Sequence, residues 1–137
     1  MSARTRSVSA VEADRRAVHA RAFLLAAQLV DELGEDAGID PATTIVGSLA
    51  VLAGIAASDA ICGLARGERS GENHADAVLL LRRSTPPGSS ASTQLKRLLD
   101  AKSTAHYSAD LISPTKAAEL LSAASRLVAH MDTIAPR

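Results

Sequence analysis

The chain has 137 residues, enough for one domain that buries a core without disulfides or metals. Hydrophobic residues make up 47% of it and aromatic residues only 1%, so the core must be built from Ala, Leu, Val and Ile, which favours packed helices over sheets. The 15 basic and 15 acidic residues cancel, which excludes a general electrostatic attraction to nucleic acid but leaves room for a local basic cleft.

A single domain is expected after a short N-terminal tail. Residues 1–8, with Arg4 and Arg6 among serines, are expected to form a disordered tail, and residues 9–134 a single helical domain. No apolar run follows the two arginines, as a secretory signal requires, so we expect a cytoplasmic protein.

A first helix is expected from about Ser9 to Leu33. Its first half is basic, and this part is either a phosphate-binding patch or a solvated face balanced by Glu12 and Asp14. The basic residues are Arg15, Arg16, His19 and Arg21. The apolar residues recur at helical spacing, which predicts that they face the core: Val11, Val18, Ala22, Leu25, Leu29 and Leu33.

A second helix is expected from Pro41 to about Ala65, with Asp40 as its N-cap. It carries no charge from Pro41 to Ser58, but it is short of the ~20 predominantly apolar residues of a membrane span and contains Gly and Ser. A buried central helix is therefore expected, and no membrane. One face consists of small residues that let a neighbouring helix approach closely. The opposite face is expected to fill the core with Ile45, Leu49, Leu52 and Ala56.

Three residues in the middle of the chain have side chains whose environment can be predicted. Asp59 lies at the edge of the second helix's apolar face and is expected to be partly exposed or paired with a cation. Cys62 stands among apolar residues and is expected to be an unreactive core thiol. His74, in a short third helix over residues 72–83, is either a hydrogen-bonded histidine at an edge or part of a site with Asp59 or His106.

Two further helices complete the chain. After a loop over residues 84–92 that is rich in Pro, Gly and Ser, a fourth helix is expected to run to about Ser108. Ser113 and Pro114 then begin a fifth helix with a regular apolar stripe. The expected fold is all-α, an up-and-down bundle of four long helices plus a short one.

The fourth helix holds the candidate catalytic site. Lys102 and His106 lie one turn apart, on the same stripe as the leucines of this helix. A histidine that titrates near neutral pH can take the proton of a ribose 2′-hydroxyl, and a neighbouring cation stabilises charge on the phosphoryl oxygens, with Arg97 as a further cation. Such cleavage of RNA needs no metal and no cofactor. The structural alternative is a histidine stabilised by the helix dipole and a lysine whose stem covers the leucines.

Two segments of the chain carry a family resemblance. The order of the helices, the run Ala-Ser-Asp-Ala-Ile-Cys at residues 57–62 and the segment 98–107 followed by Ile-Ser-Pro at 112–114 resemble the HEPN superfamily, in particular small actinobacterial HEPN-like proteins. The resemblance covers about residues 40–130. It implies a bundle that dimerises through the face carrying the signature and, in active members, a metal-independent endoribonuclease.

The signature of that family is degenerate in this chain. In active members an arginine separated by four to six residues from a histidine forms a site across the two-fold axis. His106 matches the histidine, Lys102 stands in for the arginine with a shorter gap, and Arg97 lies at a longer one. The resemblance also makes Tyr107, which follows the histidine, the candidate for adenylylation by a nucleotidyltransferase.

The partners expected from the resemblance are those of a toxin–antitoxin or defence setting. They are a second copy of the chain, an RNA substrate, and an antitoxin or nucleotidyltransferase. Two alternatives stay open: a non-catalytic module that binds a partner protein through the same face, and a bundle with a small-ligand or nucleotide pocket under the loop at residues 86–92.

Overall fold

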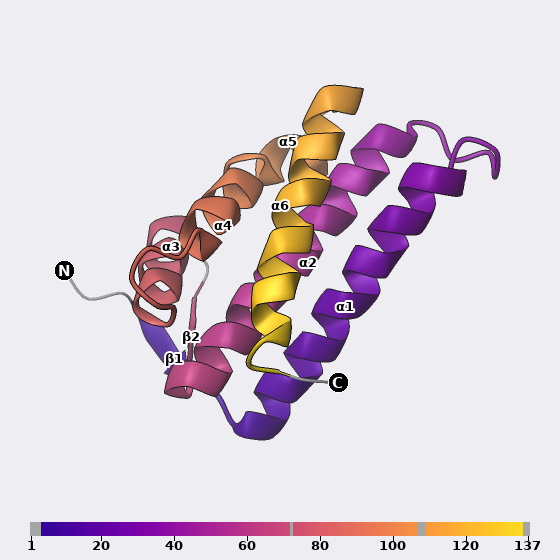
Figure 1. Cartoon of the computed structure of the whole chain (residues 1–137). Coiled ribbons are helices and arrows are strands. Elements are labelled where there is room, and N and C mark those ends of the chain that lie inside the picture. The colour runs from indigo at the N-terminus through magenta and orange to yellow at the C-terminus, as the bar shows by residue number, and fades with distance from the viewer. Residues whose placement is uncertain (1–3, 72, 107–108, 136–137) are drawn as a thin grey trace.

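The fold is mainly helical, as a computed structural model describes it for residues 4–71, 73–106 and 109–135 (Figure 1). The expected all-α class is confirmed at this level. The helices of the described residues are α1 (Ala10–Leu33), α2 (Ala42–Arg66), α3 (His74–Arg83), α4 (Ala91–Asp100), α5 (Lys102–His106) and α6 (Pro114–Asp132). Only α1, α2 and α6 are long, because the expected fourth helix is divided at Ala101 into α4 and α5.

The central element is α2, which contacts every other helix of the described chain. In Figure 1 it runs behind α6, with α1 on one side and α3 and α4 on the other. It begins differently from the prediction, since Pro41 rather than Asp40 is the N-cap and supplies no side-chain hydrogen bond. By length and composition α2 is apolar enough to cross a membrane, with a hydropathy of 2.0 over its most apolar window, but 67% of that window is buried inside the bundle.

Small residues of α2 make room for its neighbours in two ways. At Gly63 the backbone of α1 comes so close that a Cβ would lie 2.8 Å from the Cβ of Ala13. At Gly54 the space is filled instead by the side chain of Leu98 from α4. The predicted close approach of a helix therefore occurs at Gly63, whereas the small residue Gly54 receives a leucine.

The opposite face of α2 does not fill the core as predicted. Ile45 is exposed, and Leu49 and Leu52 are only half-buried. Of the four predicted residues only Ala56 is fully buried. The reason is that leucines from α4 and α6 already occupy the space beside the small residues of α2.

The apolar stripe predicted to bury α1 lies on the surface. Val11, Val18, Leu25, Leu29 and Leu33 are 58, 60, 57, 48 and 54% exposed. The helix instead packs on α2 through alanines, which are Ala13, Ala17, Ala20 and Ala27. Close approach to α2 favours small side chains at the centre of the contact, while the larger Phe23, Leu24 and Val30 pack at its edges and the predicted stripe points outward.

Part of the segment predicted as a tail forms a strand. Thr5–Ser7 form β1, which pairs antiparallel with β2 (Glu68–Ser70), a segment predicted as a polar turn. The buried Val8 continues this contact, since its N–H donates to the carbonyl of Gly67 at 2.9 Å. Gly67 has φ of +67°, a left-handed conformation that ends α2 and turns the chain into β2.

The C-terminal half confirms the predicted boundaries best. Ser113 accepts a hydrogen bond from the backbone N–H of Lys116 and Pro114 begins α6, as its residue types favour. The apolar stripe of α6 is buried apart from the partly exposed Leu121. Helix α3 starts two residues later than predicted, at His74, with Asn73 as its N-cap.

Candidate functional site

One pocket of the described chain is cationic. It has a volume of about 340 Å³ and lies between the β1–β2 pair and the helices α2, α3, α4 and α5, with one residue from α1. Its basic residues are Arg6, Arg16, Arg69, His74 and Lys102. The only carboxylate in its lining is that of Asp59. A chain without net charge thus concentrates positive charge at one place.

The strand pair sets two of these arginines against each other. Arg6 and Arg69 are directly opposite in the register of β1 and β2, so their side chains leave the same face of the pair. Like charges at opposed positions repel, and neither arginine forms an ion pair with a carboxylate in the described residues. Two neighbouring guanidinium groups are suited to bind an anion.

Asp59 neutralises part of this charge from α2. Its carboxylate accepts a hydrogen bond from Nη2 of Arg16 at 3.1 Å, and its side chain is 15% exposed. Burial raises the pKa of Asp59, because desolvation of the carboxylate outweighs the attraction of Arg16 and Arg69. The expected pairing of Asp59 with a cation is confirmed, and the remaining cations of the pocket are left without a carboxylate of their own among the described residues.

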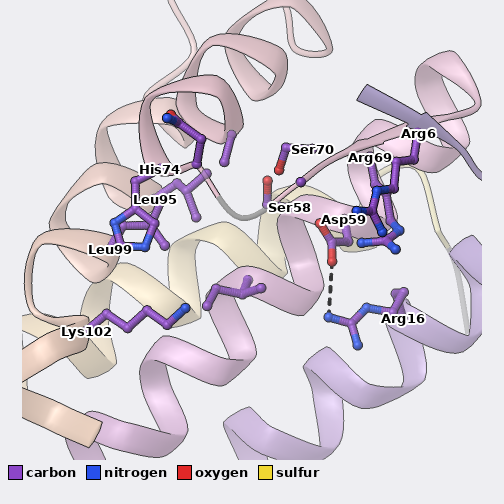
Figure 2. A pocket seen from close by; sticks show the side chains of 14 residues that line it. Arg6, Arg16, Ser58, Asp59, Arg69, Ser70, His74, Leu95, Leu99 and Lys102 are labelled. Atoms are coloured by element: carbon purple, nitrogen blue, oxygen red, sulfur yellow. Dashed lines mark hydrogen bonds and ion pairs between the residues drawn. The ribbon is translucent and has the colours of Figure 1, made fainter. Parts of the chain in front are cut away.

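The pocket has a cationic and a less polar end. Figure 2 shows Asp59 with Arg6, Arg16 and Arg69 at one end, and Lys102 and His74 beside leucines at the other. The apolar lining comes from Ile55, Ala77, Leu95 and Leu99. Two largely buried hydroxyls, those of Ser58 and Ser70, line it as well. This arrangement suits an anionic group attached to a flat or apolar body.

Some residues predicted from sequence meet in the pocket. Lys102 lines it, and so do His74 and Asp59, which the sequence suggested as members of one site. Arg97 is exposed on α4 and does not line it. The backbone of His106 ends α5, but its side chain and all of Tyr107 lie outside the described residues.

The structure also places the loop over residues 84–92 and the basic residues of α1 relative to this pocket. The loop does not line the pocket, and the ligand pocket predicted under residues 86–92 stays a prediction. Of the basic residues in α1, Arg16 pairs with Asp59 and Arg21 with Asp132 at 2.8 Å, while Arg15 and His19 line a second hollow that shares Arg16, Asp59 and Arg69. The basic half of α1 therefore extends the cationic surface and also ties helices together.

Arg6 and Arg69 were missed by sequence reasoning. They lie on strands of three residues, which are too short for a periodic pattern, and the two strands are separated in the sequence by the whole of α1 and α2. A basic residue in each of two polar segments was the only signal present.

Thiol and metal chemistry contribute nothing visible to this pocket. Cys62 is 2% exposed and does not line the pocket, and burial raises the pKa of its thiol to about 11. Its expected role as an unreactive core thiol agrees with this burial. Within the described residues no group of three or more His, Cys, Asp or Glu side chains is arranged to hold a metal ion.

Comparisons of the chain with protein-family models, curated proteins and solved structures found no match.

Proposed function

We propose that this protein binds the phosphate group of a nucleotide in the cationic pocket. The observation that carries the proposal is the direct opposition of Arg6 and Arg69 in the strand pair, with Lys102 and His74 lining the same pocket. Opposed guanidinium groups repel unless an anion lies between them, and arginine is the residue best suited to hold phosphate in a bidentate manner. A bound phosphate removes that repulsion.

The size and lining of the pocket favour a nucleotide over inorganic phosphate. Its volume of about 340 Å³ lies at the small end of ligand sites, which span roughly 300–1,000 Å³. The apolar side chains beside Lys102 offer a surface for a base, while the cations at the other end take the phosphate. The nucleotide is either free or a residue of single-stranded RNA, since both present the same phosphate chemistry.

The wider setting of this proposal is that of a HEPN-type protein. In it the chain is an up-and-down bundle in the cytoplasm that acts as a homodimer on RNA in a toxin–antitoxin or defence setting, with an antitoxin or nucleotidyltransferase as partner. The mainly helical fold and the presence of Lys102 in the pocket support it. Tyr107 is the residue that such a transferase would modify.

Equilibrium binding by calorimetry tests the proposal with AMP, adenosine and a short single-stranded RNA as probes. We expect AMP to bind about tenfold or more tightly than adenosine, because the phosphate makes charge-assisted hydrogen bonds. Arg69→Ala should weaken AMP binding by a similar factor. The matched control, Arg97→Ala, removes an exposed arginine outside the pocket and should change nothing. Equal affinity for AMP and adenosine would contradict the proposal.

The RNA probe identifies the source of the phosphate. If RNA is the ligand, the oligonucleotide binds more tightly than AMP, and the affinity falls with rising salt in proportion to the phosphates contacted. If a free nucleotide is the ligand, AMP binds at least as tightly as the oligonucleotide.

A second candidate function is metal-independent cleavage of RNA. It is favoured by the position of Lys102 in the pocket and of His106 one turn further along α5. In it His106 transfers the proton and Lys102 stabilises the phosphoryl charge. We expect cleavage of RNA in the presence of a chelator, loss of cleavage in His106→Ala, and normal cleavage in the control His130→Ala. Equal cleavage by the unmodified protein and His106→Ala would rule this site out.

A further inference from the structure

The outward face of α1 carries a continuous row of apolar side chains. We call Val11, Val18, Leu25, Leu29 and Leu33 the outer stripe of α1; each is about half or more exposed. They lie opposite the alanines that contact α2, and in Figure 1 α1 forms one edge of the molecule. A single exposed apolar side chain is ordinary. These five apolar side chains on one helix face extend over roughly 33 Å at 1.5 Å per residue. No described segment covers this face.

We propose that the outer stripe of α1 binds the same stripe of a second copy of this chain, with the two helices antiparallel. Three residues of the stripe, Val18, Leu25 and Leu29, fall into a heptad pattern whose core positions are Arg15, Ala22 and Leu29 on one side and Val18, Leu25 and Glu32 on the other. A two-fold axis passing between Phe23 and Leu24 makes this pattern complementary to itself. It places Val18 of one copy against Leu29 of its partner, and Ala22 against Leu25.

Charge complementarity selects this occupant and this orientation. In the same register Arg15 of one copy meets Glu32 of the other at both ends of the apolar contact. Neither residue takes part in an ion pair within the described chain, and both are exposed. A parallel pair would oppose Arg15 to Arg15 and Glu32 to Glu32, which is repulsive.

The geometry of the dimer leaves the cationic pocket open. The only residue that α1 contributes to that pocket is Arg16, which lies outside the outer stripe and pairs with Asp59. The pocket of each copy therefore stays open, although Arg15 of the contact also lines the neighbouring hollow. This inference does not rest on the proposed nucleotide binding, and its interface is a different one from the face over residues 98–107 that the HEPN resemblance implies.

Light scattering coupled to gel filtration, followed by sedimentation equilibrium, tests the dimer in the full chain. The unmodified protein should have twice the monomer mass of 14.1 kDa. Leu25→Glu places two unpaired carboxylates in the apolar contact and should weaken the dimer about 100-fold. The matched control is Leu111→Glu, which alters a leucine that is 70% exposed outside α1 and should leave the mass unchanged. A monomer at the highest soluble concentration, or a dimer insensitive to Leu25→Glu, would overturn the proposal.

A charge exchange tests the register itself. Arg15→Glu and Glu32→Arg should each weaken the dimer about fivefold, because each opposes like charges at both ends. The double variant Arg15→Glu/Glu32→Arg exchanges the charges and should restore the original affinity. Additive loss in the double variant would contradict the antiparallel register. Circular dichroism of every variant confirms that the monomer fold is retained.

Discussion

The cationic pocket and the outer stripe of α1 are two incomplete regions with different causes. The pocket brings basic side chains from five separate elements around one carboxylate, so that Arg6, Arg69 and Lys102 have no ion-pair partner among the described residues. The stripe brings apolar side chains from one helix to the surface, because the residues of α1 that are fully buried are alanines on the opposite face. One region lacks an anion and the other lacks an apolar partner.

This difference makes the two regions separable by experiment. Ligand binding in the pocket is electrostatic and should weaken as salt rises, whereas burial of the stripe is hydrophobic and should depend little on salt. Charged-residue variants in the pocket should leave the oligomeric state unchanged. Substitutions in the stripe should leave ligand affinity unchanged.

The largest expected effect is a loss of stability when a residue is changed in the core that supports both regions. Leu98 is fully buried and packs against Gly54, so Leu98→Ala should lower the free energy of unfolding by about 2–5 kcal/mol. The control Leu111→Ala, at a leucine that is 70% exposed, should change it by less than about 0.5 kcal/mol. Urea unfolding followed by circular dichroism measures both. Similar losses in the two variants would mean that Leu98 is not packed as described.

The next largest effect separates the pocket from the stripe. The double variant Arg69→Ala/Lys102→Ala removes a cation from each end of the pocket and should weaken AMP binding about 100-fold. Its mass by light scattering should equal that of the unmodified protein. A change in mass together with the loss of affinity would show that the two regions are coupled.

A smaller effect of opposite sign is expected at Asp59. Its pKa is raised from 3.8 by desolvation, so as pH falls through the raised value the carboxylate takes up a proton and Arg16 loses its counter-charge. The pocket then becomes more positive, and affinity for a dinucleotide, whose phosphodiester stays charged, should rise as pH falls. Asp59→Asn should bind about fivefold more tightly at neutral pH and lose this part of the pH dependence.

Asp132→Asn is the matched control for that variant. Asp132 lies on α6, away from the pocket, and like Asp59 it pairs with an arginine, Arg21. It should leave both the affinity and the pH profile unchanged. Unaltered binding by Asp59→Asn would show that Asp59 does not face the bound phosphate.

The raised pKa of Asp59 also makes the stability of the folded chain depend on pH. Because the pKa of Asp59 is higher in the folded chain than its usual value of 3.8, the folded chain binds more protons in the window above 3.8. Asp59 therefore contributes a free energy of unfolding that decreases as pH rises through that window. Asp59→Asn should remove this contribution, which unfolding curves at acidic and neutral pH will measure.

The smallest effect is expected at Cys62. With its pKa raised to about 11 and its side chain 2% exposed, the thiol should react negligibly with iodoacetamide at neutral pH in the folded chain and fully in denaturant. Neither AMP nor dimer formation should alter this protection. Mass spectrometry of the alkylated protein provides the measurement, and rapid labelling of the native chain would contradict the burial of Cys62.

Sequence patterns predict some elements of this fold well for physical reasons. Both ends of α1 and the start of α6 were found because caps and helical periodicity act locally, as at Ser113. The orientation of α1 was predicted incorrectly, since this helix has two apolar faces, one of alanines and one of larger residues. Periodicity favours the larger residues, but close contact with α2 at Gly63 favours the alanines.

The candidate site could be predicted only in part. Lys102, His74 and Asp59 carry recognisable chemistry within helices, and the fold brings them to one pocket. Arg6 and Arg69 become visible only through the pairing of β1 with β2, which depends on tertiary structure. The break at Ala101, which separates Lys102 from the leucine stripe of α4, had no proline or glycine to mark it.

The central claim is that a nucleotide phosphate lies in the cationic pocket, and an NMR titration of the ¹⁵N-labelled chain with AMP tests it most directly. We predict saturable shifts of the amide signals of Ser58, Ser70, Gly71 and His74, which line the pocket, with those of Val18 and Leu25 unchanged. Adenosine at the same concentrations should produce much smaller shifts. Shifts confined to other surfaces, or equal shifts with adenosine, would contradict the claim.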